Sequence, residues 1–316
     1  MMDNPPASKR QRTEMPEIVR SHFWMVYGHV ILQAESTQFR VNRDLLLRHS
    51  PIFETMFSLP IPADEPRVEG CHVVQVTDTA QDWTEIFELM YNPPYRGALP
   101  HRTVCAMVRL GKKYEMTRIC EDALARLHHE FPTTLNDYGK SDIFSEIKDD
   151  VRMKVDILNL CYQHGIRTCI PILAFSILDG TPNLDVLICD DGMHMAAALL
   201  PELKLLLAVG ASKITLHQKS TFEWLTSTMA IPAPGCHDPG ACTKARQRIY
   251  LDIVWGNGQY RYPLFFSWDR MAGGGRFCGR CFEAGSGLYR AGRMASWAAL
   301  PSFFKLAGWD DLKDAE

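Results

Sequence analysis

The sequence has no apolar run long enough to cross a membrane. Its most apolar stretches, Cys169 to Leu178 and Ala196 to Leu207, are too short or are interrupted by Glu202 and Lys204, whereas a spanning helix needs about 20 apolar residues. No secretory apolar segment follows Met1. We therefore expect a soluble intracellular protein, in the nucleus, the cytoplasm or both, with no membrane partner.

An excess of charge of one sign is also missing. The chain has 34 basic and 37 acidic residues, a net charge of −3, and no long basic face. Nucleic acid is therefore not expected as a partner. Residues 1–18 are polar, bear prolines and lack apolar periodicity, which predicts a disordered tail. Within it Lys9 to Arg12 has the form of a nuclear import signal, although such clusters also occur in solvated tails.

Catalytic motifs are absent or incomplete. The sequence contains no H-E-x-x-H and no G-x-S-x-G pattern. Ser302 to Lys305 fits S-x-x-K, but no S-D-N or K-T-G partner follows, and the serine lies in an aromatic segment. Ala272 to Phe277, AGGGRF, lacks the lysine of a P-loop. We therefore expect a non-enzymatic protein with no catalytic and no cofactor-binding residues.

Ten cysteines are present, and in a reducing compartment they are core residues or metal ligands rather than bridges. Six are scattered singly, mostly on apolar stripes, and we expect buried thiols there. These six are Cys71, Cys105, Cys120, Cys161, Cys169 and Cys189.

The other four cysteines form two pairs near the C-terminus. Cys236 and Cys242 flank a Pro-Gly bend in PGCHDPGACTKAR, and Cys278 and Cys281 form Cys-x2-Cys in RFCGRCFEAG. A tetrahedral structural Zn²⁺ takes four thiolates, and Cys-x2-Cys presents two of them from one tight turn. We predict a closed structural zinc site with sulfurs about 3.5 to 4 Å apart. Buried thiols or a disulfide are the alternatives.

Two further readings bear on this cysteine site. His237 is a rival ligand, although neighbouring residues seldom reach the same ion. A thioredoxin-like redox motif would need a βαβ context that the sequence does not have. Ile249 to Trp255, between the two cysteine pairs, reads as a strand-like run.

Gln38 to Phe57 is the most informative segment of the chain. Strand-forming residues at positions 31, 32, 39 and 41 flank a Ser36-Thr37 turn, and Asp44 is placed to cap a helix of three leucines. Ser50-Pro51 then has the favoured pair for starting a second helix, serine at the N-cap and proline in the first turn.

Downstream patterns extend this unit to about Pro132. His72 to Val76 alternates like a strand, and Thr79 opens a helix with an apolar stripe from Trp83 to Tyr91. Val104 to Tyr114 and Cys120 to Leu127 are two further helical patterns.

The order of these elements, and the phrase LGKKYEMTRICEDALARL, resembles a BTB/POZ domain. The resemblance implies an α+β fold with a three-stranded sheet and helical hairpins, followed by an all-α extension and a small Cys-rich helical C-terminal region. With 316 residues, two or more domains are expected. The predicted layout is a tail at 1–18, a BTB/POZ domain at 19–132, a helical extension at 133–228 and a Cys-bearing region with a zinc staple at 229–316.

The resemblance also implies partners. BTB/POZ domains associate with themselves, here through Trp24 and Met25 of the first strand and Leu45 and Arg48 of the first helix. Many carry a charged pocket at that interface, but only Arg43 of its usual residues is retained here. By analogy a cullin would dock on the helices around Trp83 to Tyr91 and Val104 to Tyr114. The resemblance thus favours a substrate adaptor of a cullin-type ubiquitin ligase, and a nuclear oligomerising scaffold or transcriptional co-regulator is the alternative.

After Pro132 the sequence is almost wholly helical in pattern. One stripe runs from Ile147 through Val155 to Tyr162 with Gly165 as its C′ residue, Thr168 and Pro171 open a second helix, and Pro201-Glu202 open a third. These helices either bind another protein or only pack on the preceding domain. An aromatic tail from Trp297 to Leu312 must bury its rings. The order of all these motifs resembles the expanded BTB-domain proteins of mushroom-forming (basidiomycete) fungi.

Overall fold

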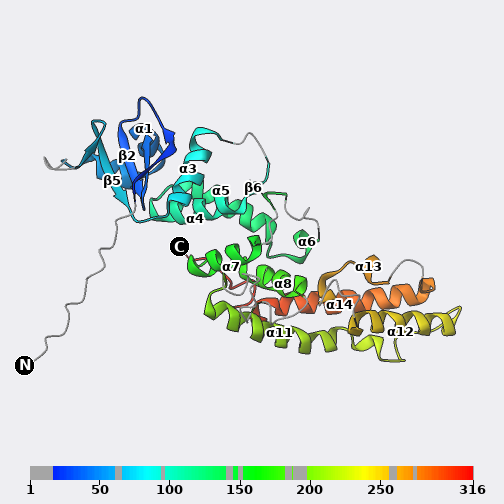
Figure 1. The fold of residues 1–316 in the computed structure, drawn as a ribbon. Coiled ribbons are helices and arrows are strands. Elements are labelled where there is room, and N and C mark those ends of the chain that lie inside the picture. Colours follow the sequence, from blue (N-terminus) through cyan, green and yellow to red (C-terminus); the bar gives the residue numbers. More distant parts are fainter. Residues whose placement is uncertain are drawn as a thin grey trace, which may run out of the picture. The chain divides into compact units, whose positions relative to one another are not determined.

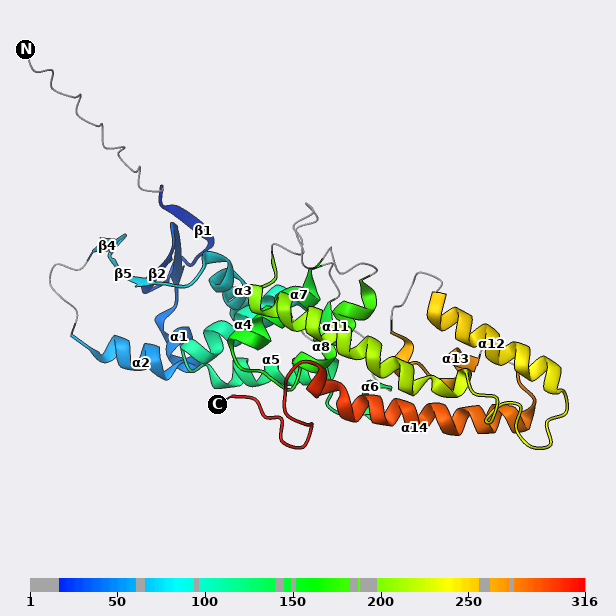
Figure 2. The ribbon, with the colours of Figure 1, turned by 90° about the horizontal axis from the view of Figure 1, so that it is seen from below.

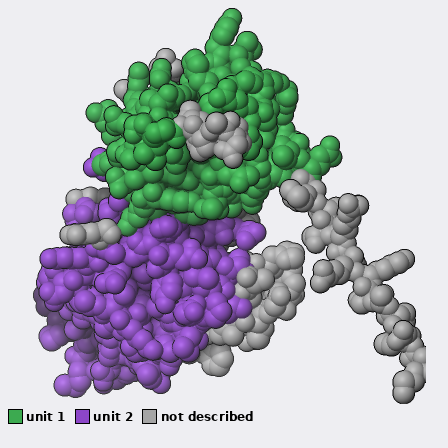
Figure 3. Space-filling view, turned by 90° about the vertical axis from the view of Figure 1, so that its left-hand side faces the viewer, with its two compact units in different colours: residues 1–95, 106–120 green, residues 96–105, 121–316 purple. Residues whose placement is uncertain are grey.

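The computed structural model describes residues 17–60, 66–93, 97–139, 145–148, 152–181, 187, 198–255, 262–272 and 276–315. The chain divides into two compact units, unit 1 with residues 1–95 and 106–120, and unit 2 with residues 96–105 and 121–316 (Figure 3). No helix in the described ranges is both long and apolar enough to cross a bilayer. The predicted basic signal at Lys9 to Arg12 lies outside the described residues.

Unit 1 is built on a mixed sheet of five strands, blue to cyan in Figure 1. In spatial order these are β1 (Val19–Trp24), β3 (Thr37–Val41), β2 (Val30–Ala34), β5 (Cys71–Val76) and β4 (Arg67–Val68). β1 runs parallel to β3 and β2 parallel to β5, and the other neighbours are antiparallel. The predicted hairpin is present, but its turn is Glu35-Ser36 rather than Ser36-Thr37, because Thr37 already pairs with Ala34 as the first residue of β3. The sequence pattern predicted three strands, because the very short β4 and the long-range pairing of β1 leave little local signal.

The helices of unit 1 begin where the capping residues predict. Ser50 accepts a hydrogen bond from the Phe53 amide at the start of α2 (Pro51–Ser58), and Thr79 accepts one from the Asp82 amide at the start of α3 (Ala80–Tyr91). The Ser50 hydroxyl also donates to the Tyr114 carbonyl at 2.6 Å. The capping role predicted for Asp44 is wrong: α1 (Arg43–His49) has Asn42 as its N-cap and starts two residues earlier than predicted, so the Asp44 carboxylate lies in its first turn.

The core of unit 1 is aromatic. Trp83 lies 5.8 Å from Phe53 and 5.4 Å from Phe87 between ring centroids, and all three rings are fully buried. α4 (His101–Lys113) and α5 (Thr117–Glu130) each contribute to both units. Within unit 1 these two helices approach closely at Gly111, where a Cβ would come within 2.9 Å of the Cys120 Cβ. A larger residue at this position would push the helices apart.

Unit 2 opens with a small parallel pair of strands, β6 (Leu99–Pro100) and β7 (Ile147–Lys148). The buried Glu130 carboxylate accepts hydrogen bonds from the Glu146 and Ile147 amides at 2.6 and 3.1 Å. The predicted helical stripe starting at Ile147 is therefore wrong. The helix begins only at Met153, whereas the contact with Glu130 and the pairing with β6 hold Ile147 and Lys148 extended.

The helical extension follows as α6 (Leu135–Tyr138), α7 (Met153–Gln163) and α8 (Ile170–Gly180). Gly165 has a φ of +69°, which confirms its predicted place just after α7. α8 has Pro171 in its first turn as predicted. Thr168 does not cap this helix; its amide and hydroxyl instead donate to the Asp314 carboxylate at 2.8 Å.

Longer helices complete unit 2, namely α11, α12 and α14, of which α11 and α14 run side by side (Figure 2). Their bounds are α11 (Pro201–Thr221), α12 (Pro239–Trp255) and α14 (Gly279–Phe303), with the short α13 (Trp268–Ala272), η1 (Glu223–Leu225) and η2 (Pro263–Phe265) between them. α11 meets the end of α14 at Gly210, where any Cβ would collide with the Phe304 ring.

The strand-like reading of Ile249 to Trp255 is wrong, because these residues form the second half of α12. The buried positions 242, 245, 246 and 249 follow a helical period that begins before the β-branched run. The Asp238 carboxylate caps this helix, accepting a hydrogen bond from the Ala241 amide at 2.8 Å. Local β propensity is therefore overridden by a helix that starts ten residues earlier.

Candidate metal centre and association surface

Four cysteine side chains of unit 2 converge on one point. The sulfur atoms of Cys236, Cys242, Cys278 and Cys281 all lie within 4.8 Å of one another. The Sγ atoms of Cys278 and Cys236 are 3.7 Å apart, close to the edge of about 3.8 Å for a tetrahedron with Zn–S distances near 2.3 Å. The predicted convergence is present.

Two helix starts present these sulfurs. Cys242 lies in the first turn of α12, and Cys278 and Cys281 occupy the N-cap and first turn of α14. Cys236 lies in the turn before α12, where Gly235 takes a φ of +73°. Gly235 packs so closely on the Arg280 guanidinium that a Cβ would collide with it. Helix N-termini carry partial positive charge, which favours thiolates over thiols.

Backbone amides also point at the sulfurs. The Cys278 amide donates to the Cys242 sulfur at 3.4 Å, and the Ala233 amide donates to the Cys281 sulfur at 3.3 Å. Hydrogen bonds from the backbone of Cys281 and His237 lower the pKa of the Cys278 thiol to about 6. His237 therefore serves the cluster through its amide, and its imidazole is not among the four converging ligands.

The Cys236 thiol holds its proton more tightly in the absence of a cation. Desolvation, with hydrogen bonds that its S–H group donates to the other three sulfurs, raises the pKa of Cys236 to about 12. A bound divalent cation would lower the pKa of the Cys236 thiol, because its positive charge deprotonates the thiols that coordinate it. Four sulfurs within 4.8 Å of one another, with amide donors beside them, fit Zn²⁺, and a full set of four protein ligands leaves no open position for a reacting water.

An aromatic cluster supports the base of this site. The Trp268 ring lies parallel to Phe277 at 6.3 Å and meets Phe282 edge-on at 5.6 Å, so both flanks of the Cys-x2-Cys turn pack on one indole. Gly285 passes beside the same ring, where a Cβ would come within 2.7 Å of its Cη2 atom. Sequence reasoning did not place Trp268 here, since no local pattern links it to the cysteines.

Five of the six scattered cysteines are buried and form no disulfide, as expected. These are Cys71, Cys105, Cys120, Cys161 and Cys169, and Cys189 lies outside the described residues. Among the described residues only the C-terminal quartet has metal-ligand geometry.

The predicted association residues lie at the surface of unit 1. Trp24 ends the edge strand β1, and Met25 follows it with its amide donating to the Arg40 carbonyl at 2.8 Å. Leu45 and Arg48 are spaced i, i+3 on α1 and so share one face of that helix. Trp24, Met25 and Leu45 are part-exposed and Arg48 is exposed.

Two apolar residues beside them add to this surface. Val26 is 75% exposed and Tyr27 is 84% exposed, and both directly follow Trp24 and Met25. Exposed apolar residues that are contiguous in this way usually mark contact surfaces. The run before Gly28 was visible in the sequence, but only the structure separates its exposed members from the buried Phe23.

Arg43, the one residue of the expected charged pocket that the sequence retains, makes contacts within unit 1. The Arg43 guanidinium donates to the Phe57 carbonyl at 2.8 Å and covers the Phe57 ring at 5.1 Å, which ties α1 to α2. The carboxylate of Glu69 bridges Arg20 and Arg40 at 2.7 and 3.0 Å.

Residues 26–129 match the family model of the BTB/POZ domain. The chain therefore contains a BTB/POZ domain, which is a protein-interaction module, and the α+β fold class is confirmed. Among curated proteins the chain finds no match.

Proposed function

We propose that this protein is a non-enzymatic interaction protein that associates with itself through the BTB/POZ domain and recruits another protein with its C-terminal half. The observation that carries the proposal is the pairing of a detected interaction module with a separately built unit 2 that holds a four-cysteine cluster. The proposed layout is a BTB/POZ domain at 19–132, a helical extension at 133–228 and a zinc-stapled region at 229–316. Membership of the mushroom-forming fungal family is part of the proposal and rests on motif order.

The proposed self-association uses Trp24, Met25, Leu45 and Arg48. Edge strand β1 has one hydrogen-bonding side unpaired within its sheet, and an unpaired edge is a template for a second chain. The apolar side chains that follow it supply area to bury. When the same surface of two chains forms the interface, the product is a two-fold symmetric homodimer.

The proposed metal is a structural Zn²⁺ held by Cys236, Cys242, Cys278 and Cys281. When bound it would fix the starts of α12 and α14 to the turn before α12. Its role would be to cross-link the C-terminal half. No disulfide among the described cysteines of that half does so.

Among partners, we propose a cullin-type ubiquitin ligase scaffold for the BTB/POZ domain. Of the two helices considered for this contact, α4 is buried over nearly its whole length, whereas α3 keeps Gln81 and Glu88 exposed. The proposed cullin surface therefore centres on the exposed side of α3. A nuclear scaffold or co-regulator is the competing role.

Affinity purification of the full chain from its native cells, followed by mass spectrometry, tests the proposal. Recovery of a cullin together with other proteins supports the adaptor role, whereas recovery of chromatin proteins without a cullin supports the scaffold role. The variant Glu88→Lys should remove the cullin alone, and Glu223→Lys in unit 2 is the matched control. If no protein is recovered above the level of an unrelated bait, the recruitment proposal is wrong.

A further inference from the structure

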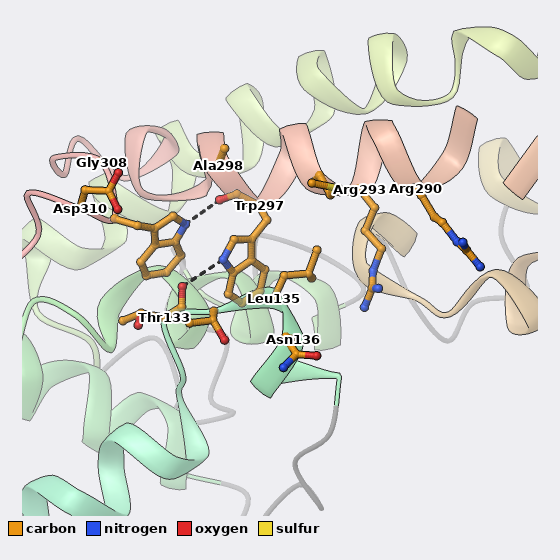
Figure 4. Close-up of a pocket in the computed structure, with 12 residues that line it drawn as sticks. Thr133, Leu135, Asn136, Arg290, Arg293, Trp297, Ala298, Gly308 and Asp310 are labelled. Carbon is orange, nitrogen blue, oxygen red and sulfur yellow. Dashed lines mark hydrogen bonds between the residues drawn. The ribbon is translucent and has the colours of Figure 1, made fainter. Parts of the chain in front are cut away.

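Unit 2 contains a cavity of about 770 Å³ between α14, the start of α6 with the two residues before it, and the C-terminal segment. Its wall includes Leu135 on one side, Arg290, Arg293 and Met294 from α14, and Trp309 from the C-terminal segment (Figure 4). This volume is within the range of specific ligand and peptide pockets.

The pocket is held rigidly by its two tryptophans. The Trp297 and Trp309 rings are stacked at 5.4 Å with an angle of 15° between planes. The Trp297 indole donates to the Thr133 carbonyl at 3.1 Å, and the Trp309 indole donates to the Trp297 carbonyl at 2.7 Å (Figure 4). Both polar atoms are thus satisfied inside the protein, and the part-exposed Trp309 ring offers the cavity apolar surface.

Positive charge is gathered at one end of this cavity. Arg290 is exposed and makes no hydrogen bond or ion pair with any described residue. Arg293 donates through Nη2 to the Phe265 carbonyl at 3.1 Å, but its Nε is buried and has no partner within the described part of the chain. A guanidinium with spare donors binds carboxylates well, because its N–H groups match the two carboxylate oxygens.

Apolar surface lies directly beside that charge. Met294 is 66% exposed. It follows Arg290 by four positions in α14, so the two side chains share one face of the helix. At the other end of the cavity stands Asp310 (Figure 4). The lining therefore offers cations and apolar side chains at one end and a carboxylate at the other.

We propose that this cavity binds a short peptide segment of a partner protein, in which a carboxylate side chain lies next to leucine-like side chains. The carboxylate would pair with Arg290 and Arg293, and the apolar side chains would cover Met294 and Trp309. This inference rests on the proposed function and names the recruitment site within unit 2. A nucleic acid fits less well, because Trp297 is only 6% exposed and cannot stack on a base, and Asp310 would repel phosphates.

Binding of synthetic peptides to the full chain tests this proposal. The probe is a fluorescein-labelled peptide with two glutamates and two leucines joined by a glycine linker, made in both orders. We expect one order to bind with a Kd below about 1 mM. Peptides with lysine for glutamate, or with serine for leucine, and a single-stranded oligonucleotide should bind at least about fivefold more weakly.

Two pairs of variants locate the site. Arg290→Glu should weaken binding at least about fivefold, whereas Arg248→Glu, an exposed arginine of α12 outside the cavity, should leave it unchanged within about twofold. Met294→Ala should also weaken binding, whereas Met229→Ala, which is 90% exposed elsewhere, should not. Circular dichroism verifies that each variant is folded.

The proposal is overturned if no peptide binds, if the lysine peptide or the oligonucleotide binds as well as the acidic peptide, or if Arg290→Glu behaves like Arg248→Glu. These results differ from a failure of the proposed function. A chain that dimerises and captures partner proteins but ignores the peptides lacks only this site, whereas a chain that binds the peptides but captures no protein lacks the recruitment role.

Discussion

The Sγ atom of Cys278 lies 3.7 Å from the Sγ atom of Cys236, although 42 positions separate them in the sequence. This contact brings the start of α14 against the turn before α12. A contact between such distant residues needs a compensating interaction, because closing the intervening loop costs chain entropy. In the proposed zinc site, coordination of one metal ion by the four sulfurs would supply that interaction.

Replacing Cys278 tests the metal site. Cys278→Ser should lose the bound zinc, because the remaining three sulfurs leave the tetrahedron open. The free energy of unfolding of the C-terminal half should fall by about 3 kcal/mol or more, while the BTB/POZ core stays folded. Mass spectrometry of metal content gives the zinc stoichiometry, and hydrogen exchange locates the loosened segments.

Cys161→Ala is the control for this metal experiment. This buried thiol belongs to unit 2 but not to the cluster, so the variant should keep one zinc per chain even if it is less stable. A full zinc content in Cys278→Ser, or no zinc in the unmodified protein purified without chelator, would show that the cluster is not a zinc site.

Self-association is tested by light scattering on the full chain, since α4 and α5 contribute to both units. The unmodified chain should be a dimer at tens of micromolar. Leu45→Asp should raise the dissociation constant of the dimer at least about tenfold, because a carboxylate would be buried against apolar surface. Leu59→Asp, at a leucine 61% exposed beyond α2, is the matched control and should remain dimeric. A monomeric unmodified chain contradicts the proposed interface.

Two glycines of α14 provide a matched pair for packing around Trp268. Gly285→Ala gains about 1 kcal/mol of helix propensity but forces a methyl to within 2.7 Å of the Trp268 ring. Overpacking of this kind costs about 1 to 3 kcal/mol, so we expect net destabilisation of up to about 2 kcal/mol.

Gly287→Ala, by contrast, meets nothing within 4 Å and should stabilise the protein by about 0.5 to 1 kcal/mol. Urea unfolding of both variants measures the difference. Equal effects of the two substitutions would mean that Trp268 does not pack on α14 as described.

The C-terminal segment should respond to acid through Asp314. Burial alone would raise the pKa of this carboxyl, but hydrogen bonds with His128 and Thr168 outweigh it and hold the pKa below its usual value. A lowered folded-state pKa stabilises the protein above the unfolded value of about 3.9, and this contribution is lost as the pH falls through the folded-state pKa.

Asp314→Asn should therefore cost about 1 to 2 kcal/mol at pH 7, and the difference from the unmodified protein should shrink below about pH 4. Asp311→Asn, at an exposed aspartate of the same segment, should have no comparable effect. Denaturant unfolding at several pH values gives both free energies. A difference that is independent of pH would contradict the assigned hydrogen bonds.

Local chemistry was sufficient to predict several features of this protein from its sequence. Ser50 and Thr79 begin helices because their hydroxyls satisfy amides that a helix start leaves unpaired, and Gly165 follows a helix because it adopts a positive φ at little cost. The four cysteines were also identifiable, since Cys-x2-Cys with a second cysteine pair is a common arrangement of zinc ligands.

Other features were decided only by contacts between distant residues. Ile147 is extended because Glu130 and β6 hold it, and Ile249 to Trp255 is helical because α12 starts at Pro239. The stacking of Trp309 on Trp297, which shapes the cavity, joins side chains that no local pattern pairs. Propensity acts over a few neighbouring residues, whereas burial and hydrogen bonding across the fold involve larger free energies and determine the conformation where the two disagree.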